Sequence, residues 1–486
     1  MLNRLTVAGP LFAALLAAAA LRGDEQNNWP VSVRQVDSAG ATVTVQYVGP
    51  LFFAGQTSAE WAGFRPFYLR SHDGDRATGA FLYPLFTWQK QGDYRHFSFF
   101  QLINRPQDRD PAGRETSGLD VWPLYFSSQT GSPETSYRAF LPFGGTLRHR
   151  LGRDRISFVL FPLYLQTANE GRQITHVPWP FLRFYDGAGH HGFEFWPLFG
   201  HSGRENDYDR QFYLWPLIYK SASHLSEPEP ERAFGVLPFY NRDTGPGYIR
   251  ENFVWPFFGY THRTIPNTYD ERRYFWPFLV QGHGPQFLVN RWAPFYTHSN
   301  IKGYDKTWVL WPLWRHATWA EDGVEQEKNQ LFFIVYWSLT QRSMTNPAAP
   351  PARKTHFWPL FSAWDNGAGH RQVQVLSPFE VFFQDNEPVR QLYTPFFALY
   401  RYDRQGPDAS RHSLLWNAVT YRRSPANREF HLGPLFSSRT TPVTRRVTVG
   451  NGLLAWRRAA AGGRWRFSLF DFHPKPDTKA PEASSP

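Results

Sequence analysis

Histidine recurs at a fixed distance from proline in this sequence. His201, His298 and His316 each lie four residues after a proline that follows an aromatic or apolar residue. Imidazole is a common metal ligand, so a ring of these residues at the rim of a closed sheet could bind a metal or an anion. We prefer a simpler interpretation, in which each histidine marks the point where a strand leaves its apolar zone. The adjacent pair His190 and His191 would point to opposite faces of a strand, so it is not expected to chelate an ion.

The sequence motifs of enzyme chemistry are missing. No nucleophile elbow, H-E-x-x-H helix, Walker loop or dinucleotide fingerprint occurs in the required context. The chain contains no cysteine, which excludes disulfides, thiolate metal sites and a cysteine nucleophile. We therefore predict a protein that is not an enzyme and that has no catalytic, cofactor or metal site. The competing class is an enzyme whose site lies in the long polar loops predicted at 104–118, 226–231 and 345–353.

The dominant feature is a short segment copied about twenty times. It consists of an aromatic or apolar residue, proline and two or three large apolar residues, and from Pro162 to Pro312 its prolines are 17 to 22 residues apart. Three copies, near Phe99, Val335 and Trp416, have lost the proline. We predict that the tryptophan–proline pairs form the structural core of each repeat: Trp122 and Pro123, Trp179 and Pro180, Trp196 and Pro197, Trp215 and Pro216, Trp255 and Pro256, Trp276 and Pro277, Trp311 and Pro312, and Trp358 and Pro359.

Turn-forming residues lie between the repeated segments. Examples are 169–173 (NEGRQ), 186–191 (DGAGHH) and 243–247 (DTGPG), where Gly, Asp and Asn favour tight reversals. A proline about every 19 residues would break any helix. One strand of about ten residues plus one connection fits this period. The sequence therefore predicts an all-β fold, an antiparallel meander of about 22 strands.

The predicted strand at 210–220 (RQFYLWPLIYK) is apolar on both faces at its centre. Such a strand must be covered on both sides, so we expect the tryptophan rings to pack in buried layers. Closure of the sheet into a large barrel is the expected solution because it removes the sheet edges. A sandwich and a solenoid of short hairpins are the alternatives. The solenoid resembles the aromatic cell-wall-binding repeats of bacterial surface proteins in period and aromatic density, but their Gly-Trp start is absent.

Proline in a strand removes a ladder hydrogen bond, which is the main objection to a membrane-embedded sheet. We therefore expect a ring of bends at the level of the prolines, with short strands leaving in two directions.

The chain ends carry separate signals. Residues 1–23 combine Arg4 with an apolar run at 11–21, which is typical of a secretory signal peptide and is too short for a membrane-spanning helix. Residues 24–472 are predicted to form a single repetitive β domain, and 473–486 a disordered tail. The segment 464–472 ends on Phe472 and resembles the C-terminal strand of outer-membrane barrels.

Composition limits the partners. The chain has 18% aromatic residues and a net charge of +11, with basic and acidic residues mixed along its length. No nucleic-acid-binding signature accompanies this charge, so no nucleic acid partner is expected. We expect a non-enzymatic exported protein of the outer membrane or cell envelope, namely an outer-membrane-type β-barrel in contact with lipid. The alternative is a soluble secreted or periplasmic β-repeat module that binds glycan or lipid through aromatic side chains.

Overall fold

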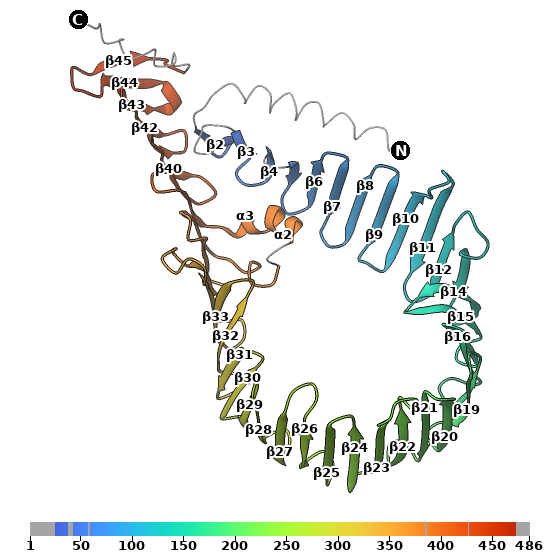
Figure 1. Ribbon diagram of the computed structural model, residues 1–486. Coiled ribbons are helices and arrows are strands. Elements are labelled where there is room, and N and C mark those ends of the chain that lie inside the picture. The colour runs from blue at the N-terminus through green and yellow to red at the C-terminus, as the bar shows by residue number, and fades with distance from the viewer. Residues whose placement is uncertain (1–24, 37–41, 57–58, 384–385, 426, 473–486) are drawn as a thin grey trace, which may run out of the picture. The chain divides into compact units, whose positions relative to one another are not determined.

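The computed structural model describes residues 25–36, 42–56, 59–383, 386–425 and 427–472 of the chain. They form 45 β-strands in an antiparallel meander (Figure 1). The helices of the described residues are short: α2 (Glu387–Leu392), α3 (Thr394–Phe397) and the 3-10 turn η2 (Gly450–Gly452). The prediction of an all-β antiparallel meander is therefore confirmed. The predicted signal peptide at 1–23 and the predicted tail at 473–486 lie outside the described residues.

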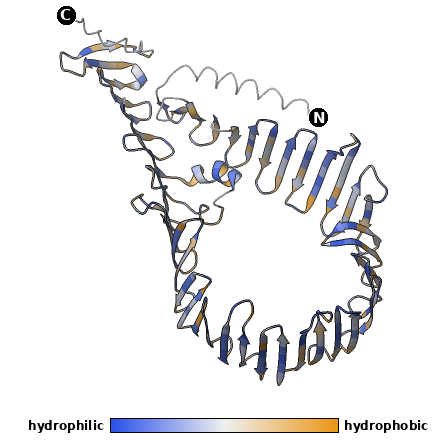
Figure 2. Cartoon of the chain, in the orientation of Figure 1, coloured by the Kyte–Doolittle hydropathy of each residue, from blue (hydrophilic) through white to orange (hydrophobic). Residues whose placement is uncertain are grey.

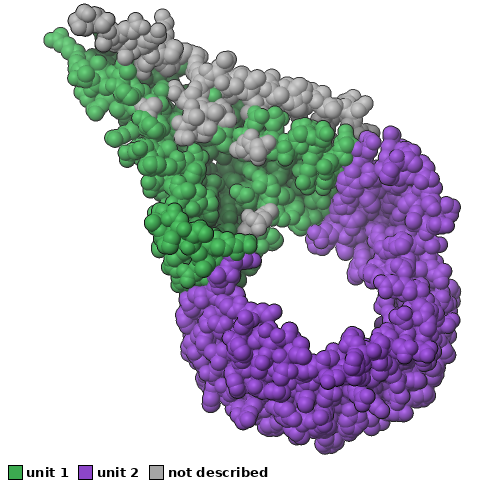
Figure 3. Space-filling model, viewed as in Figure 1, with its two compact units in different colours: residues 1–92, 322–330, 334–486 green, residues 93–321, 331–333 purple. Residues whose placement is uncertain are grey.

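The chain divides into two compact units (Figure 3). Unit 1 comprises residues 1–92, 322–330 and 334–486, and unit 2 comprises residues 93–321 and 331–333. In both units, strands that are consecutive in the chain pair with each other. A hairpin is therefore the building element throughout.

Unit 2 contains 24 whole strands, most of them five to seven residues long. They are β9 (Tyr94–Phe99), β10 (Ile103–Arg109), β11 (Glu115–Val121), β12 (Tyr125–Gln129), β13 (Tyr137–Phe140), β14 (Gly144–Arg150), β15 (Arg153–Val159), β16 (Tyr164–Asn169), β17 (Arg172–His176), β18 (Leu182–Asp186), β19 (His190–Phe195), β20 (Phe199–Arg204), β21 (Tyr208–Tyr213), β22 (Ile218–Ser223), β23 (Glu231–Val236), β24 (Tyr240–Gly245), β25 (Tyr248–Phe253), β26 (Phe258–Arg263), β27 (Tyr269–Phe275), β28 (Leu279–Gly284), β29 (Phe287–Trp292), β30 (Tyr296–Ile301), β31 (Tyr304–Val309) and β32 (Trp314–Glu321).

Unit 1 contains strands from both ends of the chain. They are β1 (Gln26–Asn28), β2 (Ser32–Val36), β3 (Thr42–Tyr47), β4 (Phe52–Gln56), β5 (Glu60–Phe64), β6 (Tyr68–Asp73), β7 (Arg76–Phe81), β8 (Phe86–Gln91), β34 (Tyr336–Ser343), β35 (Ala352–Phe357), β36 (Phe361–Asp365), β37 (His370–Val375), β38 (Tyr400–Gln405), β39 (Ser410–Leu414), β40 (Val419–Arg423), β41 (Arg428–Leu432), β42 (Phe436–Thr440), β43 (Thr444–Val449), β44 (Leu454–Ala459) and β45 (Arg466–Leu469). The remaining strand, β33 (Val324–Leu331), has residues in both units.

The expectation of one ten-residue strand per period is wrong, because each period contains two strands. The proline lies in the turn between them: β19 ends at Phe195, β20 begins at Phe199, and the N–H of Leu198 donates to the carbonyl oxygen of Phe195 at 2.7 Å. The peptide bond before Pro197 is cis. The prediction of bends at the proline level, with short strands leaving them, is consistent with this arrangement. The bends are complete chain reversals, so the described residues form 45 strands, about double the predicted 22.

The copies without proline also form turns. Residues Phe100 and Gln101 follow β9 with φ of 47° and 57°. Leu415, Trp416 and Asn417 follow β39 with φ of 49°, 54° and 75°. Two consecutive positive φ angles make the short reversal that suits the twist of a hairpin. Without proline, the same place in the sheet is therefore occupied by a turn of another conformation.

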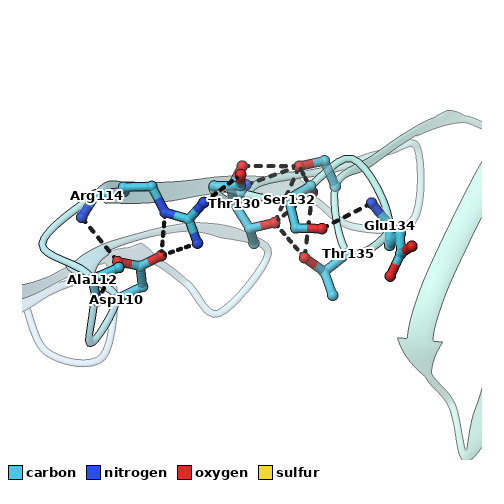
Figure 4. A network of polar contacts seen from close by, with 9 residues as sticks. Asp110, Ala112, Arg114, Thr130, Ser132, Glu134 and Thr135 are labelled. Atoms are coloured by element: carbon cyan, nitrogen blue, oxygen red, sulfur yellow. Dashed lines mark hydrogen bonds and ion pairs between the residues drawn. The ribbon is translucent and has the colours of Figure 1, made fainter.

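The predicted polar loop at 104–118 is mostly strand. β10 and β11 pair across most of this segment, and the connection between them is only 110–114. Asp110 holds this turn, because its Oδ1 accepts from the backbone N–H groups of Ala112 and Arg114, both at 2.9 Å (Figure 4). Arg114 also donates to the carbonyl oxygen of Gly131 at 2.9 Å. The long connection after β12 is thereby tied to the turn after β10.

The closed barrel that we expected is not present in the described residues. Within unit 1, β1 pairs with β2 and β45 pairs with β44, and no described pairing joins β1 to β45. The buried core is small. Its packed clusters are Phe53, Leu69 and Leu392 in unit 1, and Ala139, Leu147 and Phe158 in unit 2. Among the described helices, none is long and apolar enough to cross a membrane.

Candidate functional site

In unit 2 the turns alternate between two kinds. Because consecutive strands are antiparallel, every second turn lies at the same edge of the sheet. All the aromatic-proline turns lie at one edge of the sheet. The turns that contain Gly, Asp, Asn or Glu lie at the other edge, the polar edge. Apolar and polar segments therefore alternate along the chain (Figure 2). We call the first the apolar edge and define it by the turns and their flanking residues at 121–125, 140–144, 159–164, 177–182, 195–199, 213–218, 236–240, 253–258, 275–279, 292–296 and 309–314.

The apolar edge carries no charge. None of its segments contains Asp, Glu, Lys, Arg or His, and their residues are aliphatic, aromatic, Pro or Gly. Many of these side chains are nevertheless exposed: Phe239 is 71% exposed, Phe295 68% and Trp311 57%. A soluble protein rarely exposes a contiguous apolar patch larger than a few hundred Å², and a larger one marks an interaction site. The apolar edge is therefore the main candidate functional surface of the described chain.

The strand register extends the apolar edge into a row on one face of the sheet. Phe199 pairs with Tyr213, Tyr213 with Ile218 and Ile218 with Val236. The row continues through Tyr240, Phe253 and Phe258. Cross-strand partners point to the same face, so these side chains form one continuous band.

A second row of side chains lies on the same face, two residues farther from the apolar turn along each strand, and it is largely polar. Directly paired residues there include His201 with Gln211, Gln211 with Lys220, and Arg242 with Glu251. Two strand residues span about 7 Å. Measured from the turn tips, the apolar band is therefore about 10 Å deep, after which charged side chains begin.

Many main-chain N–H and C=O groups of the apolar edge form hydrogen bonds with one another. Trp215 donates from its N–H to the carbonyl oxygen of Pro197 at 2.7 Å, and Leu214 donates to Leu198 at 2.6 Å. The same turn-to-turn bonds join Trp276 to Phe257 at 2.8 Å and Leu310 to Phe295 at 2.7 Å. Proline has no N–H group, so each proline removes one donor that would otherwise need a partner at this edge. The objection that the prolines raise against a lipid environment does not apply when they lie in turns.

The predicted tryptophan–proline pairs lie at the turn tips. Seven pairs belong to the apolar edge of unit 2, and Trp358 with Pro359 lies between β35 and β36 of unit 1. Trp122 is 60% exposed, and Trp179, Trp215, Trp255, Trp276 and Trp311 are also exposed, whereas Trp196 and Trp358 are half-buried. The structure thus places most of these rings at an exposed edge rather than in a buried layer of this chain. The reason is that the chain reverses at each proline, so the apolar centre of the predicted strand becomes a turn.

Two of the three recurrent histidines bond to aspartates. His201 Nε2 lies 2.8 Å from Asp209 Oδ1, and His298 Nε2 lies 2.9 Å from Asp305 Oδ2. His298 and His316 both pair with Thr307 across neighbouring strands and lie in one row. Among the described residues, no group of three or more His, Asp or Glu side chains is arranged to hold a metal ion.

The opposite face of the sheet carries a buried polar network. Glu194 accepts from Arg183 at 3.2 Å, from Tyr185 at 3.0 Å and from Ser202 at 3.2 Å. Burial, followed by the Glu194 charge, raises the pKa of Tyr185 to about 12. Burial, followed by the Arg183 charge, lowers the pKa of His176 to about 4. These groups are packed against one another in the sheet, which is the arrangement of structural residues rather than of an open reactive site.

Sequence reasoning identified the residues of the apolar edge but expected them inside strands. One sequence signal could have placed these residues in turns. Uncharged proline segments alternate regularly with Gly, Asp and Asn segments, and about six residues, the length of one strand, separate each segment from the next. No protein-family model and no curated protein sequence matches this chain.

Proposed function

We propose that this chain is a non-enzymatic, exported cell-envelope protein that binds the surface of a lipid membrane by the apolar edge of unit 2. The observation that carries the proposal is the placement of every aromatic-proline turn of unit 2 at one uncharged, exposed edge. Tryptophan, tyrosine and phenylalanine are suited to the boundary between water and lipid, and Trp and Tyr are enriched there. The partner proposed is therefore lipid, and the location proposed is the outer membrane or another membrane of the cell envelope.

The depth of the apolar band supports insertion into one leaflet. Interfacial protein segments bury about 5–10 Å into the headgroup and acyl boundary, which matches the band of about 10 Å. Hydrogen bonds are needed for backbone groups in lipid, and the turn-to-turn bonds such as Trp215 to Pro197 supply them at the edge. The polar edge, with its Asp, Glu and Asn turns, would remain in water.

A membrane-spanning closed barrel is the second candidate, favoured by the long meander of nearest-neighbour strands. Spanning strands have about 9–11 residues, with an apolar band about 25 Å tall. Most strands of unit 2 have five to seven residues, and charged residues such as Lys220 and Arg242 lie in the middle of β22 and β24. The one-leaflet arrangement agrees better with these lengths.

Binding to glycan through the exposed tryptophans is the other interpretation of the same surface. The apolar edge contains no Asp, Glu, Asn, Gln, Arg or His in the segments that define it. Sugar recognition needs hydrogen-bonding groups as well as a stacking platform, because a sugar hydroxyl that is buried without a partner costs free energy. Lipid is therefore the better match to this edge.

The test is co-flotation of the purified chain with liposomes of phosphatidylethanolamine and phosphatidylglycerol. We expect the protein to float with the vesicles at high salt, because apolar insertion is not screened by ions. Accessibility of the polar edge to protease from outside the vesicle separates the candidates. If the protein binds one leaflet from outside, protease should cleave the 224–230 connection in all vesicle-bound molecules. If it forms a spanning barrel inserted in both orientations, about half of the molecules should be protected from cleavage. A folded protein that does not float overturns both.

A further inference from the structure

Unit 1 contains a partly open cavity of about 650 Å³. Its wall comes from β2 to β5 near the start of the chain, from β35 to β40 near its end, and from the insert that carries α2 and α3. A volume of this size is in the range of small-molecule sites. Every lining residue belongs to unit 1, so the cavity is independent of the apolar edge of unit 2.

The cavity wall is strongly cationic. Seven cationic side chains line it, compared with two carboxylates. The cations are Arg65, Lys354, Arg390, Arg401, Arg411, Arg422 and Arg423, and the carboxylates are Glu380 and Asp403. Like charges gathered in a concave surface focus a positive potential into it.

Arg65 is held in this wall by main-chain carbonyl groups and by an aromatic ring. Its side chain is 1% exposed, and it donates to the carbonyl oxygens of Gln391 at 2.6 Å and Pro50 at 2.9 Å. Its guanidinium lies 3.8 Å from the centre of the Phe53 ring. Burial, together with the charge of Arg401, lowers the pKa of Arg65 to about 9. Arg401 is paired with Asp403 at 2.8 Å, and a further anion in the cavity would relieve the repulsion that remains between the two arginines.

A second buried group faces the same cavity with unused hydrogen-bonding capacity. His356 lines the cavity and is 1% exposed, and neither ring nitrogen has a hydrogen-bond partner among the described residues. Its ring packs on Trp337 with the centroids 4.5 Å apart. Buried polar atoms are normally satisfied, so a group inside the cavity would complete the hydrogen bonding of His356.

The apolar part of the wall indicates the shape of the ligand. Trp61, Trp364 and Trp416 line the cavity along with the cations. Trp416 is fixed by a 2.7 Å hydrogen bond from its Nε1 to the carbonyl oxygen of Phe396. Flat aromatic faces next to arginine and lysine suit a ligand that has both a ring and anionic groups.

We propose that the unit 1 cavity is a binding site for a small organic polyanion, a sugar that carries phosphate groups. Lys354 binds the phosphates together with the N–H groups that Arg401 does not donate to its partner Asp403. His356 donates to or accepts from a polar group of the ligand, and the tryptophans contact the sugar ring. Four other arginines of the lining pair with acidic residues that lie outside it, so they mainly shape the wall: Arg390 with Glu387, Arg411 with Glu25, Arg422 with Glu429 and Arg423 with Asp408. Nucleic acid is excluded by size, and a metal cation is excluded by the charge of the wall.

The test is calorimetric titration of the full-length chain with three probes: fructose 1,6-bisphosphate, inorganic pyrophosphate and maltose. The bisphosphate is expected to bind and maltose is not. Tighter binding of the bisphosphate than of pyrophosphate would support the proposal, because the sugar ring then contributes to affinity. Equal binding of pyrophosphate would overturn the assignment of a sugar as part of the ligand. The proposal would be overturned if neither the bisphosphate nor pyrophosphate binds the folded protein at millimolar concentration.

Variants locate the site. Lys354→Gln and Arg401→Gln each remove one charge-assisted contact to the phosphates and are expected to weaken bisphosphate binding about tenfold. Arg401→Gln also breaks the ion pair with Asp403, whereas Lys354→Gln leaves that pair intact. The matched control is Arg371→Gln, an exposed arginine of β37 that does not line the cavity, and its affinity should change less than about twofold. Circular dichroism and Tm establish that each variant is folded. Equal affinities of the wild type, both cavity variants and the control would place the bound anion elsewhere and contradict the assignment.

Discussion

The main-chain N–H of Trp215 donates a 2.7 Å hydrogen bond to the carbonyl oxygen of Pro197 in the preceding aromatic-proline turn. This bond links two consecutive turns of the apolar edge through their backbones rather than through their side chains. The rings of the edge are therefore not needed to close its hydrogen bonding, and Trp215 remains 48% exposed. A surface built in this way can enter a nonpolar phase without leaving main-chain groups unpaired.

Truncation of the exposed tryptophans should separate stability from lipid binding. Trp215→Ala and Trp311→Ala should each change the free energy of unfolding by less than about 1 kcal/mol, as at other exposed positions. Each should weaken liposome binding by about tenfold to a hundredfold, because an aromatic ring that enters lipid contributes about 1.5–3 kcal/mol. Thermal unfolding and vesicle co-sedimentation measure the two effects.

The control is Trp319→Ala, in the polar half of β32, whose ring packs on Tyr304 at 5.4 Å. It should leave liposome affinity unchanged. If Trp215→Ala instead lowers stability by the 3–5 kcal/mol typical of buried aromatic residues, the ring is buried in the functional state and the exposed edge is not the binding surface.

The buried polar face of unit 2 should depend on Arg273. This side chain donates to Asn252 Oδ1 at 3.0 Å, to Thr261 at 2.8 Å and to the carbonyl oxygen of Tyr260 at 2.9 Å. Arg273→Ala leaves these buried acceptors unpaired and should cost about 3 kcal/mol. Arg272 is exposed on the opposite face, so Arg272→Ala should cost less than about 0.5 kcal/mol. Equal losses of stability in denaturant unfolding would show that the network contributes nothing specific.

In unit 1, Arg411 and Glu25 form a two-pronged ion pair although 386 residues separate them. Burial acts to raise the pKa of Glu25, but the charge and hydrogen bonds of Arg411, with smaller effects of His431 and Arg422, lower it overall. A carboxyl with a lowered folded pKa stabilises the fold above its unfolded pKa, near 4.3, and this stabilisation is lost as pH falls through the folded value.

Arg411→Gln should therefore cost about 3–5 kcal/mol at pH 7, because it leaves Glu25 buried without its main partner. The difference in stability between the wild type and Arg411→Gln should shrink as the pH is lowered below about 4. Arg390→Gln is the control, because Arg390 and Glu387 form an exposed pair and should contribute less than about 1 kcal/mol. A difference that stays constant from pH 7 to pH 3 would contradict the coupling.

His356 should make unit 1 sensitive to mild acid. Burial, followed by the charge of Lys354, lowers its pKa to about 4, whereas an unfolded histidine titrates near 6.5. Between these values the unfolded chain binds the additional proton, so stability falls as the pH decreases from about 6.5 to about 4. His356→Asn should reduce the slope of Tm against pH in this range. An unchanged slope would show that His356 does not titrate as its surroundings predict.

Composition and periodicity were sufficient to predict the all-β meander, because proline and Gly, Asp and Asn turns exclude helices at this spacing. They did not predict the strand count, because a segment such as 210–220 has apolar residues on both faces whether Pro216 lies in a strand or in a turn. Only the pairing of Tyr213 with Ile218 shows the reversal. The unit 1 cavity was not predictable, because Arg65, His356 and Arg401 come together through contacts between distant parts of the chain.

Insertion of the apolar edge into one leaflet is tested most directly by a single environment-sensitive label. The chain contains no cysteine, so Phe239→Cys at the apolar edge and Glu205→Cys at the polar edge can each be labelled specifically with NBD. On addition of phosphatidylethanolamine and phosphatidylglycerol vesicles, the label at 239 should shift to shorter wavelength and be quenched by shallow lipid-bound quenchers, and the label at 205 should not change. No spectral change at 239 in the folded protein, or quenching at 239 by probes at the bilayer centre, would contradict the one-leaflet account.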